Sequence, residues 1–92
     1  FMEMKKLFSN NYYKVMEVAL NAGETMPLHK ATSDAFIIVK EGTAKIIFSD
    51  MEAELHQGST FAIPANKEHK LQVKEAFKAF VVFASDGEIK FL

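Results

Sequence analysis

Apolar and polar residues alternate along most of the chain with the two-residue period of β-strands, and helical spacing is almost absent. Segments that alternate, or that concentrate β-branched and aromatic residues, predict strands at 12–20, 35–40, 44–49, 51–57, 59–64, 68–74 and 76–84. Residues 88–92 fit a last strand, and residues 1–9 fit either one amphipathic turn or an edge strand. Turn residues separate these segments, as at 41–43, with the spacing of roughly 8 to 12 residues typical of sandwiches and barrels.

Short strands of this kind predict an all-β fold, a small β-barrel or jelly roll, because closing the sheets onto each other removes long unpaired edges. The 92 residues suffice for one core. We therefore predict a single domain at 1–92, with an N-terminal arm at 1–10, the barrel at 11–84 and a C-terminal strand at 85–92. Phe1 precedes Met2, and we interpret it as either an added residue or a trimmed end rather than as part of the fold.

Composition narrows the classes of function. The chain is 49% hydrophobic but has no apolar run near the ~18 residues of a membrane span, so we expect a soluble protein that does not enter membranes. All basic residues are lysines, and the net charge is −1. Without an arginine fork we expect no nucleic-acid binding. The absence of cysteine and of a segment resembling a secretory signal favours a cytoplasmic location.

The stretch 23–42, GETMPLHKATSDAFIIVKEG, has the layout of half a metal site. A turn at Gly23 is followed after five residues by His29, then by Ala31 and Ala35, and the following strand ends at Gly42. A second stretch, 58–73, runs from Gly58 through Pro64 to Asn66, His69 and Val73. The two stretches cover more than half of the chain.

This layout resembles the two sequence motifs of the cupins, G-x5-H-x-H-x3-E-x6-G and G-x5-P-x-G-x2-H-x3-N. The resemblance implies a small, single-domain double-stranded β-helix or jelly-roll barrel. Cupins that bind a divalent metal use three histidines and one glutamate, and the matching positions here are His29, Ala31, Ala35 and His69. Alanine has no lone pair to offer, so two of the four ligands are missing. Asn66 stands where the family has glycine, a change that asparagine tolerates because it can adopt positive φ.

Strand alternation tests whether other residues replace the missing ligands. His56 alternates with Met51, Ala53 and Leu55 and should face solvent, whereas His69 shares a face with Leu71 and Val73 and should point inward. The nearest acids in sequence, Asp34 and Glu68, are each one residue off the inward parity. They would reach the site only across a bulge.

Four interpretations of His29 and His69 remain open. They are structural histidines bonded to backbone or water, anchors of a small-molecule cavity, a weak two-histidine metal site, or a metal-free acid–base pair. The structural interpretation ranks first for the two side chains taken by themselves. Among the functional interpretations the small-molecule cavity leads, because the two alanines leave room inside the barrel. We expect the cavity walls to be Met26, Ala31, Ala35, Ile37, Met51, Phe61, Leu71, Val73 and Phe80.

The function we predict from these residues is a small-molecule binding or sensing module. The alternative is a metal-dependent cupin enzyme of the oxygenase or isomerase type with an incomplete two-histidine site. Its cofactor would be a weakly bound divalent transition metal such as Zn, Ni or Fe, held by His29 and His69. Whether the protein is an enzyme stays open at this point, as does the identity of its ligand.

Large apolar residues occupy both faces of residues 36–39, 46–48 and 80–83, which predicts that one outer sheet face is covered. We expect a second copy to cover it, giving a homodimer, which the family resemblance also implies. In the alternative, residues 1–9 cover that face.

Overall fold

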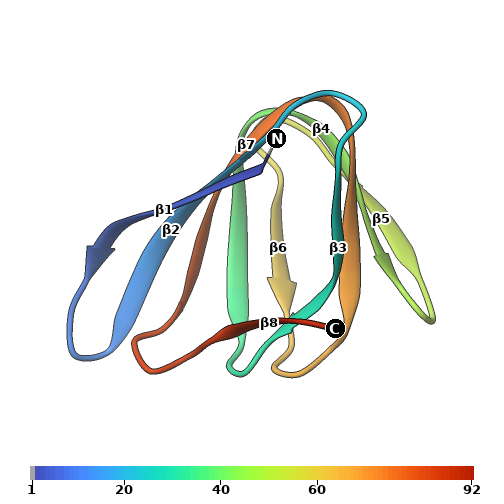
Figure 1. Cartoon of the computed structure of the whole chain (residues 1–92). Coiled ribbons are helices and arrows are strands. Elements are labelled where there is room, and N and C mark those ends of the chain that lie inside the picture. The colour runs from blue at the N-terminus through green and yellow to red at the C-terminus, as the bar shows by residue number, and fades with distance from the viewer. Residues whose placement is uncertain (1) are drawn as a thin grey trace.

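The computed structural model describes residues 2–92, and Phe1 lies outside them. The described chain forms strands and no helix, as the sequence predicts. They are β1 (Met2–Ser9), β2 (Tyr13–Leu20), β3 (Thr25–Ala31), β4 (Ala35–Phe48), β5 (Glu52–Leu55), β6 (Thr60–Ile63), β7 (His69–Ala84) and β8 (Ile89–Phe91). Figure 1 shows them curled into a barrel, from one side of which the β1–β2 hairpin extends.

Two long strands, β4 and β7, hold the barrel together. They pair antiparallel over almost their full length, from Ala35 opposite Phe83 to Phe48 opposite His69. The second half of β7 also pairs with β2, and its first half pairs with β3. All eight strands thus form one hydrogen-bonded sheet. β4 and β7 bend and divide it into two halves, β1-β2-β7-β4-β6 and β8-β3-β7-β4-β5, which are called the two sheets of the barrel below. The sequence-based division of each into two shorter strands is wrong, because each bends where it passes between the sheets and does not stop.

The bend in β4 lies at Gly42, where the sequence predicted a turn. The pairing register shifts three times between Val39 and Ala44. Gly42 has φ +87°, and a Cβ atom on it would overlap the main-chain carbonyl oxygen of Ala76 on β7. Only glycine satisfies both constraints without strain. The residue thus allows β4 and β7 to stay paired around the corner of the barrel.

The faces of the strands follow the predicted alternation. Ile37 and Val39 of β4 are buried, as are Leu71 and Val73 of β7. His56 lies in the exposed segment after β5. Side chains of opposite parity, such as Phe36 and Ile38, face outward and keep 43% and 36% of their surface exposed.

The two ends of the described chain lie at sheet edges. β1 pairs with β2 from Met2 opposite Leu20 to Ser9 opposite Lys14, which makes it an edge strand rather than a helical turn. It lies beside the barrel and leaves Phe36 and Ile38 exposed, so residues 2–9 do not cover that face. β8 pairs with β3 and crosses one open end of the barrel (Figure 1). None of the described residues belongs to a helix long and apolar enough to cross a membrane.

Candidate functional site

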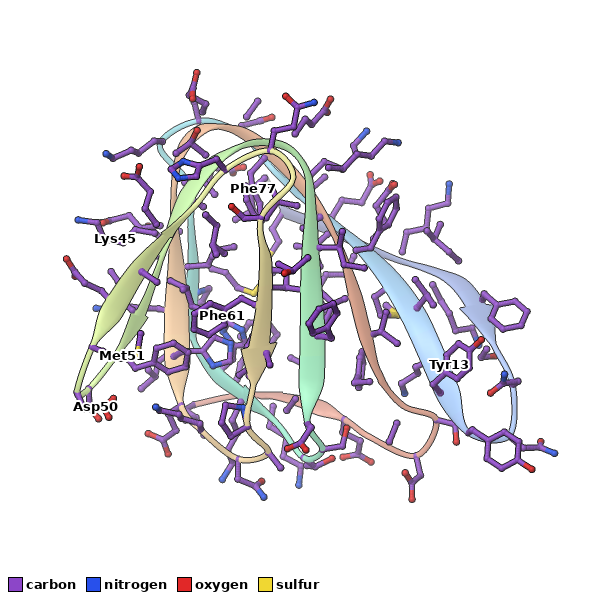
Figure 2. All side chains as sticks on the ribbon, turned by 180° about the vertical axis from the view of Figure 1, so that it is seen from behind. Tyr13, Lys45, Asp50, Met51, Phe61 and Phe77 are labelled. Carbon is purple, nitrogen blue, oxygen red and sulfur yellow. The ribbon has the colours of Figure 1, made fainter. Side chains whose placement is uncertain are left out.

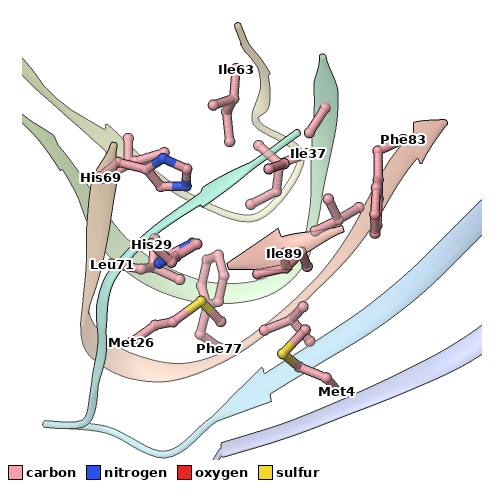
Figure 3. Close-up of a pocket in the computed structure, with 15 residues that line it drawn as sticks. Met4, Met26, His29, Ile37, Ile63, His69, Leu71, Phe77, Phe83 and Ile89 are labelled. Atoms are coloured by element: carbon pink, nitrogen blue, oxygen red, sulfur yellow. The ribbon is translucent and has the colours of Figure 1, made fainter. Parts of the chain in front are cut away.

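The barrel encloses an apolar cavity of about 50 Å³. Within residues 2–92, its fifteen lining residues come from seven strands (Figure 3). They are Met4, Val18, Met26, His29, Ala31, Ala35, Ile37, Ile46, Ile63, His69, Leu71, Phe77, Val81, Phe83 and Ile89. Thirteen of these side chains are hydrocarbon or thioether, so within the described residues 2–92 His29 and His69 supply the only side-chain nitrogen or oxygen atoms of the lining.

His29 and His69 are direct cross-strand partners on β3 and β7. Their ring centroids are 4.2 Å apart and the ring planes meet at 63°. Both are buried, with 7% and 5% of their surface exposed. In Figure 3 the two rings lie side by side at one end of the cavity, while Phe83 and Met4 lie toward the other.

A bulge at Pro27 turns His29 inward. The pairing of β3 with β7 shifts between Met26 and His29, and Pro27 and Leu28 both face outward. Proline has no N–H group to give to the strand ladder, so a bulge is where a strand accepts it. Because the consecutive residues Pro27 and Leu28 both face outward, Met26 and His29 both point into the cavity. Strict alternation would place Met26 and His29 on opposite faces of the strand.

Each imidazole is fixed by a hydrogen bond to the main chain two residues before it. Nδ1 of His29 donates to the carbonyl oxygen of Pro27 at 2.7 Å, and Nδ1 of His69 donates to that of Lys67 at 2.8 Å. A carbonyl oxygen only accepts, so in both rings the proton sits on Nδ1. In the neutral ring Nε2 then carries a lone pair.

Burial keeps both rings neutral. It lowers the pKa of His29 below the ordinary value of 6.5, against the opposing effect of the bond to Pro27, and the charge of a protonated His69 lowers it further. Burial likewise lowers the pKa of His69, again against its main-chain bond. At pH 7 the pair therefore presents two lone pairs and no charge.

Aromatic rings complete the surroundings of the pair. The Phe91 ring of β8 lies 5.5 Å from the His29 ring, and the Phe48 ring of β4 lies 5.4 Å from the His69 ring. Phe48 in turn stacks on Phe61 at 5.9 Å. These rings shield the histidines from bulk water, which accounts for the direction of their pKa shifts.

The structure brings most of the sequence-predicted site residues together. Met26, Ala31, Ala35, Ile37 and Leu71 line the cavity with the two histidines. The described lining also includes residues the sequence reasoning missed, among them Phe77, Val81 and Phe83 of β7, a segment in which large apolar residues on both faces left no clear signal.

Four predicted wall residues lie elsewhere. Met51 sits beside Asp50 at the tip of the β4–β5 hairpin and is 43% exposed (Figure 2). Phe80 has the outward parity of β7, between the buried Ala79 and the cavity-lining Val81. Phe61 stacks on Phe48 rather than bordering the cavity. Val73 is buried, but its main chain pairs with Gly23 and Glu24 beyond the end of the cavity.

The residues do not fit the metal set of the family. Ala31 and Ala35, at two of its four ligand positions, line the cavity beside the histidines. Within residues 2–92 no group of three or more histidine, cysteine or acidic side chains could hold an ion. Asp34 is exposed and its Oδ1 accepts a hydrogen bond from the Ala65 main chain, and Glu68 is exposed. Two imidazoles fall short of the three protein ligands usual at catalytic zinc sites.

The family follows from comparison with known proteins. A model described as Cupin domain matches residues 16–83, which run from within β2 to within the last residues of β7. The chain therefore belongs to the cupin family. A comparison with curated proteins finds no match.

Solved structures share the double-stranded β-helix fold. A cupin-2 domain containing protein from Shewanella frigidimarina is 28% identical, with a TM-score of 0.76 over 87% of this chain and 78% of its own. The polyketide cyclase RemF from Streptomyces resistomycificus is 17% identical, with a TM-score of 0.86 over 99% of this chain and 70% of its own. A salicylate 1,2-dioxygenase from Pseudaminobacter salicylatoxidans is 16% identical, with a TM-score of 0.86 over 97% of this chain but 30% of its own. The last two likenesses concern the fold alone.

Proposed function

We propose that this cupin binds a small molecule in its barrel cavity, as a binding or sensing module. The observation that carries this proposal is the histidine pair at one end of an otherwise apolar cavity. Apolar walls with a few convergent polar atoms are typical of ligand sites. Ala31 and Ala35 support the proposal, because they leave space at the positions where metal-binding cupins carry ligands.

Methyl-selective NMR tests this proposal. Methyl groups of Ile37, Ile63 and Leu71 border the cavity, whereas those of Ile38 and Ile47 face outward. A bound small molecule should shift the first group during titration and leave the second unchanged. Replacing Ala35→Leu should fill the cavity and abolish these shifts. Shifts spread evenly over both groups, or surviving in the Ala35→Leu variant, would contradict binding in the cavity.

The alternative function is a metal-dependent cupin enzyme of the oxygenase or isomerase type. The neutral state of both rings favours it, since metal ligation requires an unprotonated nitrogen. Elemental analysis of protein purified without a histidine tag separates the two functions. Stoichiometric metal that disappears in a His29→Ala variant would contradict the metal-free module. Absence of metal after soaking with Ni²⁺ or Zn²⁺ would contradict the enzyme. A cytoplasmic location stays a prediction, which cell fractionation tests.

A further inference from the structure

The hydrogen-bonding character of the cavity restricts which molecules it accepts. Nδ1 of each histidine is already engaged as a donor, to Pro27 and to Lys67. The remaining ring nitrogen of each histidine, Nε2, therefore acts as a hydrogen-bond acceptor toward any other partner. In the part of the chain that the structure describes, the lining contains no lysine, serine, threonine, tyrosine or amide side chain that could donate a hydrogen bond.

We propose that the cavity takes a small, uncharged molecule with at least one O–H or N–H group on an apolar body, and that Nε2 of His29 and of His69 accepts its hydrogen bonds. This inference rests on the proposed function and names the ligand class. A ligand that brought only acceptor atoms would face two lone pairs with no proton between them. Buried polar groups left unpaired in this way oppose binding.

The same lining excludes a charged ligand. Among the described residues, the thirteen apolar side chains of the lining offer no counter-ion. Moving a carboxylate or an ammonium group into such surroundings carries a large desolvation cost. A carboxylate would in addition direct its own lone pairs at those of Nε2. The ligand is therefore neutral when bound.

The volume sets the size of the ligand. A cavity of about 50 Å³ has room for on the order of four water molecules. This is far below the roughly 300 to 1,000 Å³ of drug-sized ligand pockets. A ligand with a handful of non-hydrogen atoms fits without rearrangement.

A larger ligand would have to displace β8. This strand contributes Ile89 to the lining and places Phe91 against His29. Its pairing with β3 covers three residues, from Ala31 opposite Ile89 to His29 opposite Phe91. β8 is thus held by a shorter pairing than β1 or β6, the other lining strands that have a single partner strand.

Three probes of nearly the same shape test the ligand class. Propan-2-ol donates a hydrogen bond, acetone only accepts one, and acetate is an anion. They are titrated at pH 7.5 in EDTA, which removes metal, and the cavity methyls of Ile37, Ile63 and Leu71 report binding. We expect propan-2-ol to bind about fivefold more tightly than acetone, the effect of one net hydrogen bond, and acetate to leave the methyls unshifted.

Matched variants assign the effect to the two rings. His29→Phe and His69→Phe keep an aromatic ring but remove Nε2, and each should lower the affinity for propan-2-ol about fivefold while leaving that for acetone unchanged. His56→Phe, on the exposed segment after β5, should change neither. If the cavity variants do not fold, long-range ¹H–¹⁵N spectra of the wild-type imidazoles give the same answer. Both Nε2 resonances should lie in the unprotonated range and move when propan-2-ol is added.

The outcomes separate the ligand class from the proposed function. Acetone or acetate binding as tightly as propan-2-ol, or a protonated Nε2 in either ring, would overturn the ligand class and leave cavity binding intact. If no uncharged probe, including a wider screen of small molecules, shifts the cavity methyls, binding in the cavity itself is contradicted.

Discussion

His29 and His69 face each other across the β3–β7 ladder with their ring centroids 4.2 Å apart. Each ring is fixed by a hydrogen bond to the carbonyl oxygen two residues earlier in the chain, that of Pro27 in β3 and that of Lys67 just before β7. The pair is therefore oriented by the main chain before any ligand arrives, and it does not depend on other side chains for its tautomer. Such preorganisation lowers the entropy cost of binding.

Acid should destabilise the fold through this pair. Because burial lowers both pKa values below 6.5, the unfolded chain binds more protons than the folded chain between the folded values and 6.5. The contribution of the two neutral histidines to the free energy of unfolding is thus fully present above pH 6.5. It is lost as the pH falls from 6.5 toward their folded-state pKa values. Urea unfolding at pH 7.5 and 5.5 measures the difference. His69→Phe should reduce it and His56→Asn should preserve it. An equal pH dependence in all three proteins would contradict this origin.

Restoring the missing side chains should create a metal site. Ala31→His combined with Ala35→Glu places two further donors in the cavity lining beside the histidine pair. We expect this double variant to retain one Zn²⁺ or Ni²⁺ per chain after dialysis, measured by elemental analysis, because it completes a four-ligand set. Ala31→His alone, with three nitrogen donors, should retain less. A double variant that retains no more metal than the wild type would show that the four positions do not converge.

Gly42→Ala should be strongly destabilising. The residue has φ +87°, which costs an L residue roughly 1 to 3 kcal/mol, and the added Cβ would also collide with the Ala76 carbonyl. Gly23→Ala is the matched control, since Gly23 has φ +85° but open space around its Cα. We expect chemical denaturation to show about 1 kcal/mol lost at position 23 and more than twice that at position 42. Equal losses would mean that the β4–β7 corner relaxes freely.

A second copy of the chain should cover the outer face of the β1-β2-β7-β4-β6 sheet. Phe36 lies opposite Val82, Ile38 lies opposite Phe80, and these four side chains point away from the cavity. Light scattering should give twice the chain mass of 10.4 kDa. Phe36→Ser should shift the protein toward the monomer, because it removes a large apolar side chain from this face.

Ile47→Ser is the control for this dimer, because Ile47 lies on the outer face of the other sheet. It should leave the mass unchanged. A wild-type mass near 10.4 kDa at every concentration would rule the dimer out.

Much of the barrel could be predicted from sequence because side chains alternate along strands. This rule placed His69 and Leu71 inside and His56 outside, as observed. Motif spacing likewise predicted a turn conformation. The family carries glycine at position 66, and Asn66 there has φ +64°. These features are local, so a few neighbouring residues specify them.

The parts that were not predicted depend on breaks in the alternation. β3 was absent from the predicted strands, and the bulge at Pro27 decides that Met26 and His29 share a face. In residues 76–84 large apolar side chains occupy both faces, so the pattern could not tell that Phe80 points outward. Met51 has the right parity but precedes the first residue of β5, where the sheet no longer constrains it. The face that each of these side chains takes depends on how its segment pairs with neighbouring strands, which the local sequence does not specify.

The double membership of β7 has a consequence for how the chain folds. β2 and β3 both take a pairing partner from residues 69–84, and the two sheets share this one strand. As the chain is synthesised, β1 can pair with β2, and β4 with β5 and β6, but the barrel cannot close until β7 has emerged. Closure then joins segments far apart in sequence, a topology associated with slow folding. Until that step the apolar cavity walls are open sheet faces. The time needed to synthesise β7 therefore sets how long these faces are exposed to aggregation.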